Sequence, residues 1–129
     1  PRPTPRPGGQ TQPTQPPAQQ GFSCGGFRTT SPPEGGTVVY GQNTFFWDGV
    51  AGANAYQLEI NVFYDDGTRA GGGLFRIGAN QTNLTVDLSQ ANFGSGTNIR
   101  WRAQVLQGAE PNFVAVCDTP YVSNRIVYP

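Results

Sequence analysis

Three residue types are absent from this chain of 129 residues: lysine, histidine and methionine. Without histidine, neither a Ser-His-Asp triad nor a Cys-His pair can be built. Without lysine, the chain has no Schiff-base nucleophile, no phosphate-binding P-loop and no means of forming lysine-linked polymers. The sequence therefore predicts a protein that is not an enzyme and that uses no cofactor.

Charge and long hydrophobic runs are also scarce. Eight arginines balance eight acidic residues, so the formal net charge is zero. Nucleic-acid-binding proteins normally carry a basic excess or a basic stripe, and with neither visible we expect no nucleic-acid partner. No apolar run approaches the ~18 residues of a membrane-spanning helix, so we expect no membrane span. Because the chain starts at Pro1 and has no methionine, we expect it to be processed or cut from something longer.

The chain contains two cysteines, Cys24 before the expected folded part and Cys117 near its end. Their number and spacing fit neither a zinc site nor a CxxC redox pair, so we expect no metal site here. We expect instead a disulfide between them, with two separate buried thiols as the alternative. Since disulfides persist in oxidising compartments, this pairing predicts an extracellular or cell-surface protein.

Residues 1–21 differ from the rest of the chain in being rich in proline, threonine and glutamine, with almost nothing apolar. Such a segment cannot bury enough surface to fold alone, and its composition favours an extended polyproline II arm or stalk. Its two charges, Arg2 and Arg6, are candidate interface residues that we expect to pair with acidic loops such as Asp65-Asp66 of a neighbouring copy. Three residues are candidate O-glycosylation sites: Thr4, Thr11 and Thr14.

Residues 22–129 consist of short runs of alternating polarity, separated by Gly, Asn, Asp and Pro. Residues 56–64 and 99–105 alternate most clearly, and Phe45 and Trp47 share a face with Phe46 pointing the other way. The further candidate strands are residues 38–40, 74–77, 84–88, 112–116 and 124–128. About seven short strands with turn signals between them predict an all-β, antiparallel two-sheet sandwich.

The connections contain three informative motifs. Asp65-Asp66-Gly67 is expected to be a hairpin turn, not a catalytic or calcium-binding carboxylate pair. Gly71-Gly72-Gly73 lacks the lysine of a phosphate-binding loop and is expected to be a flexible connection between the sheets. Two N-x-Thr sequons make two residues candidate N-glycosylation sites: Asn80 and Asn83.

Several short stretches resemble a fibronectin type III domain of bacterial surface proteins. They are SPPEGG at 31–36, FFWDGVAGA at 45–53 and YQLEI at 56–60, with GT at 96–97 before WR at 101–102. The resemblance implies an immunoglobulin-like sandwich in which Trp47 and Tyr56 pack across the two sheets. The tyrosine corner of the family is missing, because Ile99 stands where the tyrosine is expected. A related immunoglobulin-like sandwich is the alternative.

Together these features favour a non-enzymatic structural or adhesive module. We expect a surface-filament subunit that assembles noncovalently with itself, its N-terminal arm docking on a neighbour. Exposed aromatic residues are candidates for the contact between subunits: Phe46, Phe63, Phe113 and Tyr121. The alternative is a carbohydrate-binding or cell-adhesion module, or a passive spacer. In the carbohydrate-binding case, the residues that stack on sugar rings are Phe63, Tyr64, Phe113 and Tyr121.

Overall fold

The computed structural model of the chain describes residues 23–129. The predicted arm, with Arg2, Arg6 and the three candidate O-glycosylation sites, lies outside the described residues. Within the described range the chain is almost entirely β-structure, with one short 3-10 helix, η1 (Ala91–Phe93). This part of the chain contains no helix that is long and apolar enough to span a membrane.

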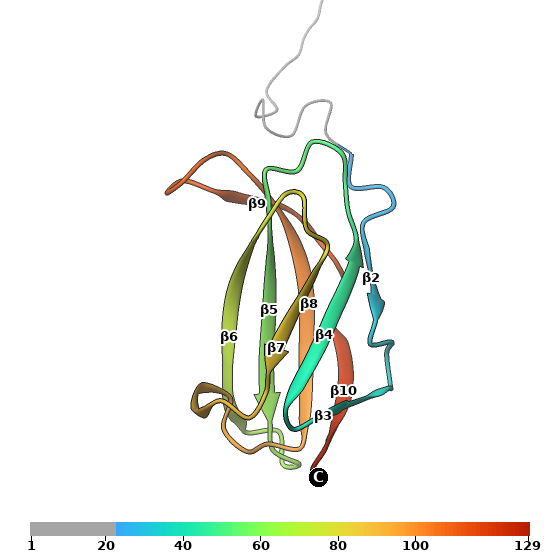
Figure 1. Cartoon of the computed structure of the whole chain (residues 1–129), viewed down its shortest axis with the longest axis vertical. Coiled ribbons are helices and arrows are strands. Elements are labelled where there is room, and N and C mark those ends of the chain that lie inside the picture. Colours follow the sequence, from blue (N-terminus) through green and yellow to red (C-terminus); the bar gives the residue numbers. More distant parts are fainter. Residues whose placement is uncertain (1–22) are drawn as a thin grey trace, which may run out of the picture.

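The strands of residues 23–129 form two facing sheets, which confirms the predicted all-β sandwich (Figure 1). The strands are β2 (Arg28–Ser31), β3 (Thr37–Val39), β4 (Gln42–Asp48), β5 (Ala55–Phe63), β6 (Arg69–Gly78), β7 (Asn83–Asp87), β8 (Asn98–Gln107), β9 (Val114–Asp118) and β10 (Val122–Val127). The larger sheet has the order β3-β10-β8-β5-β6, with β9 also paired to β8, and the smaller sheet has the order β2-β4-β7. Neighbouring strands are antiparallel except β3 and β10, which are parallel. The strand β2 was not predicted.

One edge of β8 is shared by two strands. The first half of β8 pairs with β10 and the second half with β9. Residues 119–121 separate β9 from β10, and the Thr119 hydroxyl accepts a hydrogen bond from the Ala103 amide (3.0 Å). This separation brings Tyr121 to the outer side of the sheet, opposite Arg102.

The core lies between the sheets and is built from alternate residues of the strands, as the pattern predicted. Phe45 of the small sheet packs edge-on against Trp101 of the large sheet, with ring centroids 4.9 Å apart. Trp47 packs against Tyr56 with ring centroids 5.7 Å apart, as the family resemblance implied. The Trp101 Nε1–H is buried but donates to Asn124 Oδ1 (2.8 Å), so this large side chain is packed without an unsatisfied donor.

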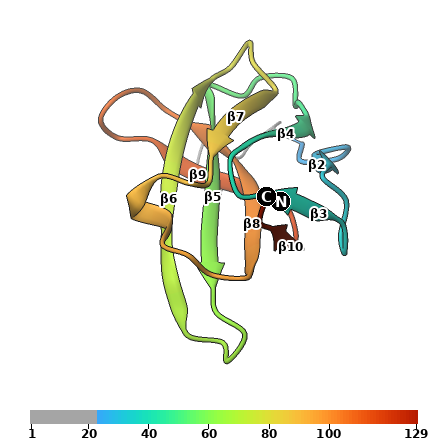
Figure 2. The same cartoon turned by 60° about the horizontal axis from the view of Figure 1, so that its bottom comes forward.

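The expectation that Gly71-Gly72-Gly73 connects the two sheets is wrong, because all three glycines lie within β6 and pair with β5. A Cβ at Gly71 would lie 2.7 Å from the backbone carbon of Phe93, since η1 packs against this part of β6 (Figure 2). A Cβ at Gly72 would lie 2.5 Å from Nη2 of Arg69 and 2.6 Å from the Ile60 carbonyl oxygen. The glycines therefore permit close packing on both faces of the strand.

Other predictions differ in boundaries only. The expected strand at 74–77 is the end of β6, and those at 112–116 and 124–128 are β9 and β10 with shifted limits. The turn at Asp65-Asp66-Gly67 joins β5 to β6, and Gly67 has a φ of 88°, in the region that favours glycine.

The predicted disulfide is present between Cys24 and Cys117, whose Cα atoms are 5.8 Å apart. It joins the segment before β2 to β9, across 93 residues of sequence. The start of the described chain is therefore fixed to the same sheet that contains β5, β6 and β8.

Candidate functional site

The aromatic residues singled out from the sequence do not gather in one place. Phe46 lies on the outer side of the small sheet, far in the fold from the other candidates. Phe63 ends β5, whereas Phe113 precedes β9, and the strand register puts these two at opposite ends of the large sheet. Tyr64 is exposed next to the β5–β6 turn. Of these candidates, Tyr121 is the one that contacts the polar centre of the sheet.

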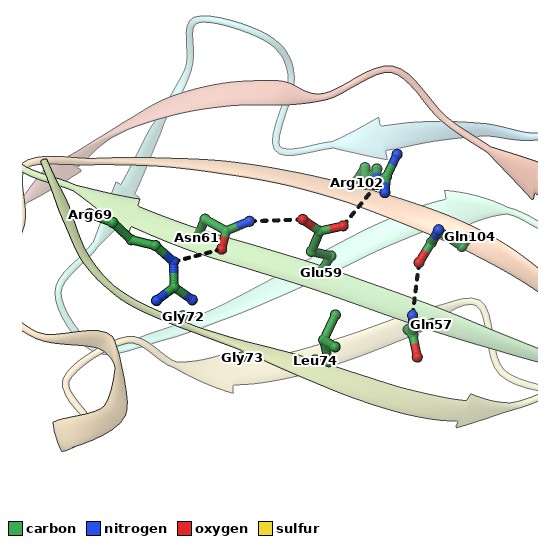
Figure 3. Close-up of a pocket in the computed structure, with 9 residues that line it drawn as sticks. All are labelled: Gln57, Glu59, Asn61, Arg69, Gly72, Gly73, Leu74, Arg102 and Gln104. Atoms are coloured by element: carbon green, nitrogen blue, oxygen red, sulfur yellow. Dashed lines mark hydrogen bonds and ion pairs between the residues drawn. The ribbon is translucent and has the colours of Figure 1, made fainter. Parts of the chain in front are cut away.

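A shallow groove of about 600 Å³ runs over the outer face of β5, β6 and β8 (Figure 3). It is lined by Gln57, Glu59, Asn61, Arg69, Gly72, Gly73, Leu74, Arg102 and Gln104. The pleat of β5 places Gln57, Glu59 and Asn61 on this face, because their apolar neighbours in sequence point into the core. Gly72 contributes no side chain, which leaves the hollow on the β6 side.

Glu59 lies at the centre of a hydrogen-bonded row across the groove. Its carboxylate accepts hydrogen bonds from Asn61 Nδ2 (2.9 Å), Arg102 Nε (2.9 Å) and Tyr121 Oη (2.8 Å). Arg69 Nε extends the row by donating to Asn61 Oδ1 (3.1 Å). The side chains are thus held in fixed positions by one another.

The same contacts determine the protonation state of Glu59. Burial raises the pKa of its carboxyl group, but the hydrogen bonds from Tyr121, Arg102 and Asn61 lower it more, and the pKa lies below its ordinary value. Burial, followed by the bond to Glu59, raises the pKa of Tyr121, which stays a hydrogen-bond donor at neutral pH. An ionised carboxylate with three donors suits ligand binding better than proton transfer.

A second set of contacts orders the end of the groove nearest β9. Gln57 Nε2 donates to Gln104 Oε1 (2.8 Å), and Gln104 Nε2 donates to Asp118 Oδ1 (2.8 Å). Gln104 is buried although it faces outward, and both ends of its amide are hydrogen-bonded. These two hydrogen bonds determine the amide orientation of both glutamine side chains, which line the groove.

Tyr121 lies between two arginines at the β8 side of the groove. The guanidinium carbons of Arg100 and Arg102 are 4.9 Å and 4.7 Å from the centroid of its ring. Such cation–π contacts hold the two arginines and the ring in one layer. Arg102 also forms an ion pair with Glu59, whereas Arg100 has no ion pair within residues 23–129.

The charges that are balanced in the sequence are distributed unequally between the two sheets of the fold. Five of the six arginines in the described range lie on the outer face of the large sheet: Arg69, Arg76, Arg100, Arg102 and Arg125. Three acidic residues accompany them: Glu59, Glu110 and Asp118. The remaining arginine and five acidic residues lie on the small sheet or in loops: Arg28, Glu34, Asp48, Asp65, Asp66 and Asp87. The outer face is thus basic by two charges, while the rest of the described chain is acidic by four.

No basic stripe is visible along the sequence, because these arginines come from three strands whose pairing only the fold reveals. The one local signal was the alternation of Arg100 and Arg102 on the polar side of their strand. The prediction of no nucleic-acid partner depends on the charge pattern along the sequence. It does not take into account a basic face that is assembled from separate strands.

The two candidate N-glycosylation sites lie away from the groove. Asn80 is exposed in the turn between β6 and β7, and Asn83 is half-buried at the start of β7, opposite Phe46 on β4. Within the described part of the chain, no group of three His, Cys, Asp or Glu residues is placed to hold a metal ion.

Comparisons of the chain with protein-family models, with curated proteins and with solved structures find no match. Its function is therefore inferred from its own residues.

Proposed function

We propose that this domain is a non-enzymatic extracellular adhesive module that binds an extended carbohydrate along the groove on β5, β6 and β8. The observation that supports it most is the hydrogen-bonded row from Arg69 through Asn61 and Glu59 to Arg102. Because these side chains are already ordered, a ligand would immobilise little when it binds. The disulfide supports the extracellular location.

The chemistry of the groove suits hydroxyl groups, which both donate and accept hydrogen bonds. Gln57, Asn61 and Gln104 present amides, Glu59 a carboxylate and Arg102 a guanidinium within one surface. A few fixed polar groups in a shallow concave surface are what orient a small polar ligand. The ring of Tyr121, 38% exposed, adds an apolar edge beside them.

Affinity electrophoresis through gels containing soluble polysaccharides tests this proposal. The double variant Gln57→Ala/Asn61→Ala should lose the retardation that the original chain shows. The matched control is Thr44→Ala/Thr85→Ala on the outer face of the small sheet, where the two hydroxyls bond each other at 2.8 Å. Equal retardation of both variants, or none for the original chain on any of the polysaccharides, would contradict the proposal.

A second candidate function is noncovalent self-assembly into a surface filament, with the N-terminal arm docking on a neighbour. The unequal distribution of charge favours it, since the basic face of one copy could meet acidic parts of another, and such a heterologous contact can repeat without closing. Asp65 and Asp66 form no ion pair within residues 23–129 and are exposed, as a docking arm with Arg2 and Arg6 requires.

Electron microscopy and size-exclusion chromatography with light scattering test the second candidate. A filament subunit should form ordered fibres that dissociate in high salt, and deletion of residues 1–21 should abolish them. A monodisperse monomer at every salt concentration would exclude self-assembly and leave the carbohydrate-binding proposal as it stands.

A further inference from the structure

Two guanidinium groups on the outer face, one lining the groove and one beside it, form no ion pair within residues 23–129. Arg69 uses Nε to bond Asn61, and its Nη2 lies over Gly72, where a side chain would otherwise stand. The side chain is exposed and forms no ion pair within residues 23–129. Arg69 thus holds a positive charge at the β6 edge of the hollow.

Arg100 holds the corresponding charge on the other side. It is exposed, contacts the ring of Tyr121 and has no carboxylate partner in the described chain. The register pairs Arg100 with Asn61 and Asn61 with Gly72, so the backbone of Arg100 and that of Gly72, over which the Arg69 guanidinium lies, are two strand spacings apart on either side of Asn61. That separation is about 10 Å.

These two cations lie beside carboxylates, which do not suit a densely charged anionic polymer. Glu59 and Asp118 lie on the same face and would repel a polymer as densely charged as double-stranded DNA, whose two strands together carry one phosphate charge per about 1.7 Å of helix axis. A polymer with carboxylates separated by hydroxyl-bearing rings places its negative charges further apart. Its hydroxyl groups can donate to the carboxylates and amides between the arginines.

We propose that the ligand of the groove is an acidic polysaccharide whose uronate carboxylates are bound by Arg69 and Arg100. This inference rests on the proposed carbohydrate-binding function and specifies its ligand class. A guanidinium binds a carboxylate through two parallel N–H donors, which gives both orientation and charge-assisted strength. Arg125, which lies on the same face and also has no ion pair in the described range, extends the basic surface beyond Arg100.

The test compares single variants of the full chain that each remove one exposed guanidinium. Arg69→Gln changes the lining of the groove and Arg100→Gln the surface beside it. Arg28→Gln is the control on the small sheet, where the Arg28 side chain is 73% exposed. The probes are polygalacturonate and its fully methyl-esterified form, which has the same rings without the charges. Binding is measured by biolayer interferometry at low and at physiological ionic strength, with alginate and duplex DNA as further probes.

The expected result is that polygalacturonate binds the original chain and that affinity falls with salt, because the contacts are ionic. Arg69→Gln and Arg100→Gln should each weaken binding by about tenfold, since hydrogen bonds to charged groups have that strength. Arg28→Gln should bind like the original chain. The methyl-esterified polymer should bind more weakly and should not distinguish the variants.

One outcome would overturn this inference alone. Equal affinity for the charged and the methyl-esterified polymer would show a neutral-carbohydrate site, and the proposed function would stand. Duplex DNA binding as tightly as polygalacturonate, with the same sensitivity to Arg100→Gln, would assign the face to nucleic acid and would overturn the proposed function as well. Failure to bind polygalacturonate, alginate or any neutral polysaccharide would overturn both this inference and the proposed function.

Discussion

Strands β5 and β8 present two faces that are built from alternate residues of the same segments but are ordered by different forces. On the inner face, Leu58, Ile60 and Trp101 are fully buried and pack against the small sheet. On the outer face, Glu59 and Arg102 belong to a connected set of hydrogen bonds that remains accessible to solvent. A polar sheet surface needs no such connected set to remain hydrated, so the order of the outer face exceeds what the fold requires. The comparison separates the residues that stabilise the sandwich from those that we propose bind a ligand.

The largest expected effect comes from the disulfide, whose Cys117 faces inward next to the outward Asp118. Replacing both cysteines in Cys24→Ala/Cys117→Ala should lower the free energy of unfolding by about 4 kcal/mol, because the crosslink constrains a 93-residue segment of the unfolded chain. Urea denaturation measures this change. Asp118→Asn is the matched outer-face control and should cost less than about 1 kcal/mol. Similar losses for both variants would contradict the distinction between the faces.

A smaller effect is expected at the glycines of β6. Gly71→Ala places a methyl group against the backbone of η1 and should destabilise the domain by about 1–3 kcal/mol. Gly78→Ala has no atom within 4 Å of the new Cβ and should be neutral or stabilising by up to about 1 kcal/mol. Thermal unfolding of the two variants tests whether glycine is needed at Gly71 for close packing against η1 or only makes the strand flexible. Equal melting temperatures would mean that η1 does not pack on β6 as the structure shows.

The smallest effect concerns the pH dependence of the outer face. Because the pKa of Glu59 is lowered by folding, its ionised form stabilises the native state above its unfolded pKa of about 4.3, and this contribution is lost as the pH falls through the lower folded value. Glu59→Gln should therefore be less stable than the original chain at pH 7 by at most about 1 kcal/mol. The difference should shrink as the pH falls below the unfolded pKa of about 4.3. Urea denaturation of both chains at each pH measures the difference in the free energy of unfolding. A difference that grows on acidification would contradict this assignment.

The inner face was largely predictable from the sequence, because a two-residue period with Leu58, Ile60 and Val62 on one side admits few other structures. The contact of Trp47 with Tyr56 followed from the family resemblance, and the disulfide from the number of cysteines. These features depend on local pattern or on residue type, both of which are visible in a linear chain.

The outer face was not predictable, since it depends on register and on contacts between distant segments. Nothing local places Gly72 and Arg100 on either side of Asn61, so neither the hollow nor the charges beside it could be located. Tyr121 reaches Glu59 because residues 119–121 separate β9 from β10. The glycines of β6 resembled a flexible link because η1, which requires one of them, lies about twenty residues further along the chain.

The outer face of β5, β6 and β8 is the surface that we propose binds the ligand of this domain. Chemical-shift mapping of the isotope-labelled chain, titrated with a short galacturonate oligosaccharide, tests this proposal directly. Binding at this face should give saturable shifts that are largest at the amides of Gln57, Asn61 and Arg100, with little change in the small sheet. Shifts centred on Thr44, Phe46 and Thr85, or no saturable change at any residue, would contradict it.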